Sequence, residues 1–136
     1  MENLQSTDAI FILHKIAMLL FGHFIGDFFF QHVMMSGKKF VKGWSGSMWC
    51  SAHVLVYTTV VALFYQDFSP TFILLVAIPH WIIDRWSLAH KLMCLMGRKD
   101  MMDSPDPKRA SFGAIIYVVI DQTLHFGCLY LVLTHI

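Results

Sequence analysis

Charged residues are scarce in this sequence. Only 14% of its 136 residues are Asp, Glu, Lys or Arg, whereas 57% are hydrophobic, and the mean hydropathy is +0.59. Soluble globular domains carry about 25% charged residues. The deficit argues against an ordinary soluble domain and indicates an integral membrane protein. The net charge of only +1 provides no basic surface for a polyanion, so we expect no nucleic-acid partner.

Cysteine is also rare. Cys50, Cys94 and Cys128 stand singly in separate segments, and the sequence has no Cys-x-x-Cys pair. This pattern indicates neither a zinc ribbon nor a disulfide framework. The first eight residues are acidic rather than basic, and the apolar run after them is longer than the hydrophobic part of a signal peptide. We therefore expect no cleaved leader.

Long apolar runs are what the sequence has instead. A membrane-spanning helix needs about 20 predominantly apolar residues, and four runs meet this length. We therefore predict an all-α fold, an integral membrane four-helix bundle that forms a single domain over residues 1–136. The predicted spans cover about residues 8–31, 48–66, 70–90 and 112–134.

The segment boundaries carry recognisable helix signals. Ser69-Pro70 predicts the N-cap and first turn of the third span, so the second and third spans should form an antiparallel hairpin. Ser47 and Ser111 are the predicted N-caps of the second and fourth spans. Pro79 predicts a kink in the third span.

Lysine and arginine gather in the first and third of the expected loops. The opposite side has none in its tails or in its short loop. Because basic loops remain in the cytoplasm, we predict that both termini lie outside. Arg85 and Lys91 are candidates for contact with an anionic lipid head group at the cytoplasmic interface. The basic loop residues are Lys38, Lys39, Lys42, Lys91, Arg98, Lys99, Lys108 and Arg109.

The first span contains polar residues that insertion does not explain. His23, Asp27 and Gln31 are spaced by four, so they should lie on one face of a helix. An ionised Asp near the centre of a membrane helix costs roughly 2.5–3.5 kcal/mol on insertion scales. The carboxylate must therefore serve another purpose. Gly22 and Gly26 beside it form a Gly-x-x-x-Gly motif that allows another helix to approach closely.

Each of the other spans contributes polar residues as well. Their apolar faces must turn to lipid, so the polar faces should meet inside the bundle. Nearby ionised carboxylates repel one another at low dielectric, and either protons or a cation must neutralise them. These residues are His53 in the second span, His80 and Asp84 in the third, and Asp121, Gln122 and His125 in the fourth.

A divalent metal ion neutralises carboxylates and accepts neutral imidazole ligands at the same time. Nitrogen and oxygen ligands without thiolate suit Zn²⁺, with Mn²⁺ or Fe²⁺ as alternatives, and the set is large enough for one or two ions. Any of the three Asp could instead serve as a general base, and Gln31, Gln122 and Tyr57 are expected to orient the ligands. The candidate metal ligands are His23, Asp27, His53, His80, Asp84, Asp121 and His125.

In chain order, these motifs resemble a family of small bacterial and phage inner-membrane proteins known as domain of unknown function 3307. A more distant similarity is to membrane-bound metal-dependent hydrolases. The resemblance implies a location in the bacterial inner membrane, a bound metal and a hydrolytic reaction. It is carried by His23-x-x-x-Asp27-x-x-x-Gln31, the single His53, His80-x-x-x-Asp84 and Asp121-Gln122-x-x-His125.

Three functions fit this pattern. The first is a metal-dependent hydrolase that acts on a lipid or a lipid-linked head group, with a metal-activated water as nucleophile. The second is a transporter of protons or of a divalent cation, which with only four short spans predicts a homo-oligomer. The third is a small membrane protein that binds another membrane protein, with a polar seam that only fixes helix packing.

Overall fold

A computed structural model of the chain describes residues 2–29, 41 and 43–135. Within these ranges every regular element is a helix, and the predicted all-α helical bundle is confirmed. The elements are α1 (Glu2–Phe24), the π-helix η1 (Ile25–Phe29), α3 (Trp44–Tyr65), α4 (Pro70–Arg85), α5 (Leu88–Leu95) and α6 (Pro107–His135).

In the described part of the chain, three continuous helical stretches are long and apolar enough to cross a membrane, namely Thr7–Phe29, Trp44–Tyr65 and Pro107–His135. A fourth span exists if α4 and α5 are counted together, although they are bent by 52°. The sequence predicts one helix over residues 70–90, whereas α4 ends at Arg85. It continues through Pro79, so the sharp bend follows Arg85 instead.

The helix caps agree with the sequence at one of the three predicted positions. The Ser69 hydroxyl accepts a hydrogen bond from the Phe72 amide at 3.2 Å, and the α3–α4 hairpin forms as predicted. By contrast, α3 begins at Trp44, before Ser47. Likewise α6 begins at Pro107, where the Asp106 carboxylate accepts from the Lys108 amide at 3.1 Å. Asp106 serves as the N-cap and Pro107 as the first helical residue, which are favourable residue types at these positions. The helix therefore begins before Ser111.

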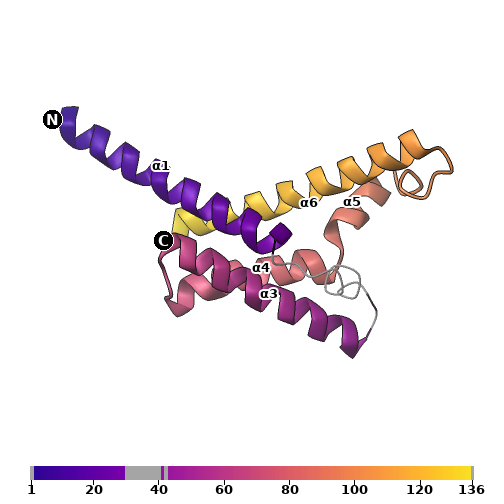
Figure 1. Cartoon of the computed structure of the whole chain (residues 1–136), viewed down its shortest axis with the longest axis horizontal. Helices are drawn as coiled ribbons and strands as arrows, with labels where there is room; N and C mark the ends of the chain where they lie inside the picture. Colours follow the sequence, from indigo (N-terminus) through magenta and orange to yellow (C-terminus); the bar gives the residue numbers. More distant parts are fainter. Residues whose placement is uncertain (1, 30–40, 42, 136) are drawn as a thin grey trace.

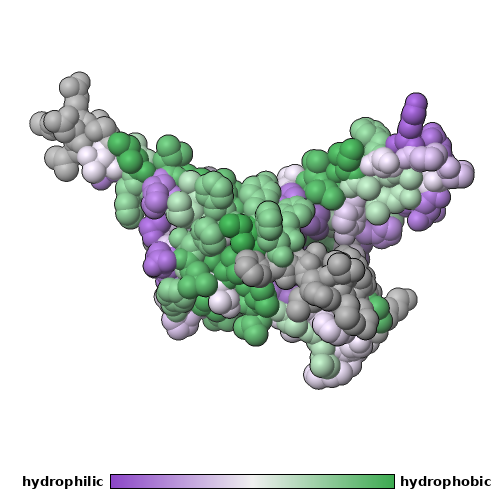
Figure 2. Space-filling model, in the orientation of Figure 1, coloured by the Kyte–Doolittle hydropathy of each residue, from purple (hydrophilic) through white to green (hydrophobic). Residues whose placement is uncertain are grey.

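The helices meet at the centre of the molecule (Figure 1). There α1 packs on α3, α3 on α4, and α4 on α6. The first half of α1 projects from this body at one end, and α5 with the start of α6 projects at the other (Figure 1). The visible surface of the body is largely apolar, as a lipid-facing surface should be (Figure 2). Its buried apolar core consists of Leu19, Tyr57, Val61, Ala62, Phe72, Val76, Leu129 and Val132.

The Gly-x-x-x-Gly motif brings α1 and η1 against α3. A Cβ atom on Gly22 would lie 3.0 Å from the Cα of Val61, and one on Gly26 would lie 3.0 Å from Cδ2 of Tyr57 and 3.3 Å from its Cα. Neither position has room for a methyl group without movement of α3. The two glycines therefore set the approach that brings the polar residues of the first span next to those of α3.

We predict that Gly22→Ala destabilises the fold by about 1–3 kcal/mol, because the new methyl group would overlap the α3 backbone. Gly127→Ala in α6 is the matched control, since no atom of the described residues lies within 4 Å of a Cβ atom there. The control should be neutral or slightly stabilising. Thermal unfolding of the detergent-purified variants measures both effects, and equal unfolding temperatures would contradict the packing described here.

Candidate metal centre

A cluster of His and Asp side chains lies inside the bundle, next to the apolar core. His53 comes from α3, His80 and Asp84 come from α4, and Asp27 comes from η1. All four are buried, with at most 6% of the residue exposed. Asp27 lies in the π-helical segment, and such segments are rare and frequently occur at functional sites. The helix packing brings these residues together from three separate parts of the sequence.

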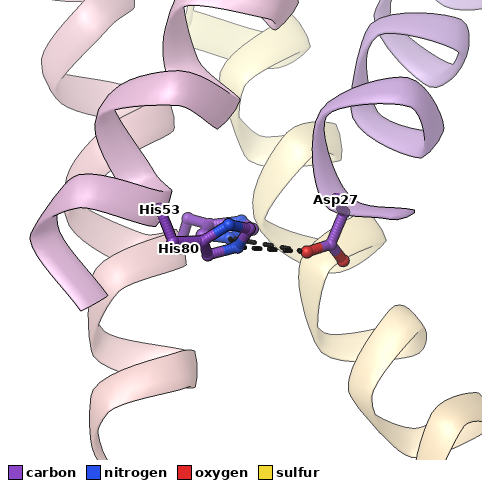
Figure 3. Close-up of side chains that lie close together, drawn as sticks. All are labelled: Asp27, His53 and His80. Atoms are coloured by element: carbon purple, nitrogen blue, oxygen red, sulfur yellow. Dashed lines mark hydrogen bonds and ion pairs between the residues drawn. The ribbon is translucent and has the colours of Figure 1, made fainter. Parts of the chain in front are cut away.

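The ligand atoms of the other three side chains all lie close to Nε2 of His53. Figure 3 shows the rings of His53 and His80 side by side and facing the carboxylate of Asp27. The Nε2 atoms of the two histidines lie 3.1 Å apart. His53 Nε2 is 3.2 Å from Asp27 Oδ1 and 3.3 Å from Asp84 Oδ2. The same oxygens lie 3.9 Å and 3.5 Å from His80 Nε2.

The five distances given above are close to those between ligands of a tetrahedral metal ion, and the sets of ligand atoms within 4.8 Å of one another place Asp27 and Asp84 in different groups. Four ligands placed at about 2.0–2.1 Å from Zn²⁺ lie about 3.3–3.4 Å from one another. The distances given above for the four atoms range from 3.1 to 3.9 Å. A hydrogen bond between the two rings uses one Nε2–H donor and one Nε2 lone pair, which leaves no proton on Nε2 of the accepting ring for the nearby carboxylates. The donor set therefore fits a divalent ion.

The charge of the cluster also calls for a cation. Asp27 and Asp84 both contact His53 Nε2, and their side chains are only 7% and 2% exposed. Two ionised carboxylates that are so little exposed to water are unfavourable unless a positive charge compensates them. The imidazoles that contact them carry a positive charge only when protonated. A divalent ion would supply this charge and leave the histidines neutral.

His125 adds a third imidazole whose tautomer is fixed by the backbone. Its Nδ1 lies 2.8 Å from the Asp121 carbonyl oxygen, which can only accept, so Nδ1 carries the proton. Nε2 must then hold a lone pair, and within the described part of the chain it has no hydrogen-bond partner although it is buried. A backbone carbonyl at one ring nitrogen is the usual support for a metal-ligating histidine.

His125 lies close enough to the cluster to share it. Its ring centroid is 4.3 Å from that of His80. One set of atoms that lie within 4.8 Å of one another comes from His80, Asp84 and His125. Two further sets of this kind come from Asp27, His53 and His80 and from Asp27, Asp121 and His125. The overlapping groups leave room for one ion or for two.

His23 is bonded differently from the other three histidines. Its Nδ1 lies 2.9 Å from the Tyr57 hydroxyl, and its Nε2 lies 2.8 Å from Gln122 Oε1. The amide oxygen can only accept, so Nε2 donates and Nδ1 accepts from Tyr57. Both ring nitrogens of a neutral imidazole are thereby used. The predicted ligand His23 thus lies beside the cluster as a hydrogen-bonded support.

Gln122 connects His23 to the carboxylates. Its Nε2 donates to Asp27 Oδ2 at 3.0 Å and lies 3.4 Å from Asp121 Oδ2. Both contacts require the same orientation of the Gln122 amide group. Its nitrogen faces carboxylate acceptors, and its oxygen faces the Nε2–H donor of His23. Tyr57 begins the chain of bonds, and its ring also stacks on His80 with a centroid separation of 3.7 Å. The predicted supports Gln122 and Tyr57 thus both contact cluster residues.

Three further predicted residues are Gln31, Arg85 and Lys91. Gln31 lies outside the described residues. The Arg85 guanidinium, predicted to face lipid head groups, donates to Ser47 Oγ at 3.0 Å and to the Gly43 carbonyl at 3.1 Å, so it ties α4 to the start of α3. Lys91 is exposed on α5.

Tyr117 is close to the cluster but is not among the residues predicted from the sequence. Its half-buried side chain lies one helical turn from Asp121 on α6. The available signal is its position four residues before Asp121, on the same face of α6. A tyrosine in an apolar membrane helix is easily taken for an interfacial residue.

The comparison with known protein families is consistent with this picture. The model of the family described as "Protein of unknown function (DUF3307)" matches residues 16–136. The chain belongs to the DUF3307 family. No curated protein and no solved structure matches it. All the cluster residues lie within the part of the chain that the DUF3307 model matches.

We predict that Tyr57→Phe destabilises this DUF3307 protein by about 1–3 kcal/mol, because the change leaves Nδ1 of buried His23 without its donor. The ring remains available to stack on His80. Tyr130→Phe is the control, since that tyrosine is 66% exposed on α6. Urea or thermal unfolding in detergent measures the difference. No difference between the variants would show that the hydrogen bond does not support the cluster.

Proposed function

We propose that this protein is a membrane-embedded metalloenzyme that hydrolyses a lipid or a lipid-linked head group. The observation that carries the proposal is the convergence of His53 Nε2, His80 Nε2, Asp27 Oδ1 and Asp84 Oδ2 at the spacing of metal ligands. We assign these four atoms to a divalent ion. Zn²⁺ suits the nitrogen and oxygen donors best, with Mn²⁺ or Fe²⁺ as alternatives.

The other cluster residues receive separate roles. His125 is a further ligand, either to the same ion or to a second one, because its Nε2 lone pair is fixed by the bond from Nδ1 to Asp121. His23 and Gln122 hold Asp27 in place. Supports of this kind typically change metal affinity or activity by about 10–100-fold when they are removed.

Hydrolysis requires a group that accepts a proton from the attacking water. A divalent ion supplies the nucleophile by lowering the pKa of a coordinated water to about 7. Asp121 is best placed to take the proton, because its side chain is 18% exposed whereas those of Asp27 and Asp84 are 7% and 2% exposed. Its Oδ2 lies 3.6 Å from His125 Nδ1. We therefore assign Asp121 as the general base.

The location follows from the apolar helices and the basic loops. Three or four helices can cross a bilayer. We place the protein in the bacterial inner membrane, with the loop of residues 98–106 in the cytoplasm, because Arg98 and Lys99 lie there and Lys108 and Arg109 follow at the start of α6. The centre is then reached from the cytoplasmic leaflet.

The metal content of the protein tests the centre itself. We predict at least one Zn²⁺, Mn²⁺ or Fe²⁺ per chain after purification in detergent, with loss of the ion in His80→Ala because the ligand set loses a nitrogen. His14→Ala is the control, since His14 is exposed on α1 and lies outside the cluster. Elemental analysis provides the readout. A folded wild-type protein without metal, even after incubation with Zn²⁺, would refute the proposal.

Incorporation of oxygen from water tests for hydrolysis while the substrate is still unidentified. The metal-loaded protein in vesicles of bacterial lipid extract, prepared in ¹⁸O-labelled water, should release a product that carries the label. Asp121→Asn should retain the metal and lose at least about 100-fold of the rate, the lower range for removal of a general base. Flux of the ion across the vesicle membrane without labelled product would favour a transporter instead.

A further inference from the structure

A pocket lies between α5 and α6, next to the break that separates α4 from α5. It has a volume of about 390 Å³ and is lined by Ser87, His90, Met102 and Tyr117. Pockets that bind small molecules measure about 300–1,000 Å³. The loop of residues 98–106 supplies Met102 and packs closely on α6, since a Cβ atom on Gly113 would lie 2.8 Å from the Cβ of Met101. The wall of the pocket that contains Met102 is therefore held in place by close packing of the loop on α6.

The pocket adjoins the metal centre on two helices. Ser87 follows the ligand Asp84 by three residues, and its amide donates to the Asp84 carbonyl oxygen at 3.1 Å. Tyr117 precedes Asp121 by four residues on α6, so the two side chains lie on the same face of that helix. A molecule in the pocket would thus lie beside the two helices that carry Asp84 and Asp121.

The pocket offers hydrogen-bond donors to a ligand. The lining is mostly apolar, and its described residues with polar groups are Ser87, Tyr117 and His90. Ser87 holds a left-handed backbone conformation with φ of 49°, which is unfavourable for a residue other than glycine, and its hydroxyl makes no capping bond to α5. Strained residues of this kind concentrate at functional sites. The described lining has no acidic side chain, and the hydroxyls of Ser87 and Tyr117 are the groups that could donate to an anionic ligand.

The surroundings of the pocket match a lipid with such a head group. Lys91 is exposed on α5, and so are the apolar side chains of Leu95 and Met96, at 83% and 54%. Figure 2 shows hydrophilic surface at the tip of the arm formed by α5 and the start of α6, and apolar surface between that tip and the body. An acyl chain can lie along such a surface while the head group reaches the pocket.

We propose that the pocket between α5 and α6 binds the phosphorylated head group of a membrane lipid, with the Tyr117 hydroxyl donating to the phosphate. This inference rests on the proposed function, since it names the substrate class of the same centre. The phosphate oxygens accept from Tyr117 and Ser87, the head group fills the pocket, and the chains remain in the bilayer. Tyr117 holds the phosphate on the side of the cluster where Asp121 lies.

Lipid binding by the full-length protein tests this assignment. The detergent-purified protein is incubated with phosphatidylglycerol, with diacylglycerol and with glycerol phosphate, and bound lipid and metal are measured by native mass spectrometry. We expect phosphatidylglycerol to bind more tightly than the other two. Tyr117→Phe should weaken it roughly tenfold, as for one hydrogen bond to an anionic group, and Met102→Trp should block the pocket. Tyr130→Phe is the control, and the metal content of Tyr117→Phe should remain that of the wild type.

The outcomes separate this proposal from the metal centre. Equal binding of diacylglycerol, or unchanged phosphatidylglycerol binding in both Tyr117→Phe and Met102→Trp, would overturn the proposal even if the metal is present. Glycerol phosphate that binds as tightly as the lipid would show a soluble phosphate ester as the ligand and overturn the lipid assignment. A wild-type protein that binds the lipid in a Tyr117-dependent manner but holds no metal would support the pocket and refute the proposed function.

Discussion

The rest of the structure depends on one constraint, the close contact between two buried imidazoles and two buried carboxylates. These belong to His53, His80, Asp27 and Asp84. Buried carboxylates in a lipid environment are unfavourable unless a positive charge compensates them. The helices therefore have to bring imidazoles and carboxylates together, and they do so at distances of 3.1–3.9 Å. A divalent ion held by these side chains would join α3, α4 and η1, so the group that supports chemistry would also hold the helices together.

Several features of the fold position these four side chains. Gly22 and Gly26 allow α1 and η1 to approach α3 so closely that a methyl group would not fit. The π-helical segment carries Asp27, and a Tyr57–His23–Gln122 chain of hydrogen bonds fixes its carboxylate from the other side. Tyr57 belongs to the apolar core and also stacks on His80. Packing and site geometry are consequently coupled through a single side chain.

The helices and most members of the cluster can be predicted from the sequence. The bonding partners of the individual residues cannot. Offsets of four place His80 with Asp84 and Asp121 with His125, and these pairs depend only on helix periodicity. The different role of His23 depends on Gln122, 99 residues away, which only the packing of the helices brings within reach. Arg85, the last residue before the bend, likewise bonds to Gly43 and Ser47 on another part of the chain. Periodicity carries no information about such long-range partners.

The coordination shell of the bound ion is the most direct test of the central claim. X-ray absorption spectroscopy on the zinc-loaded protein in detergent should show only nitrogen and oxygen neighbours at about 2.0–2.1 Å, with the outer-shell scattering of at least two imidazoles. No cysteine belongs to the donor set, and the thiol of buried Cys50 bonds to the Trp81 carbonyl oxygen instead, so no sulfur should appear in the shell. A zinc–sulfur distance near 2.3 Å, or a shell without imidazole, would contradict the assignment.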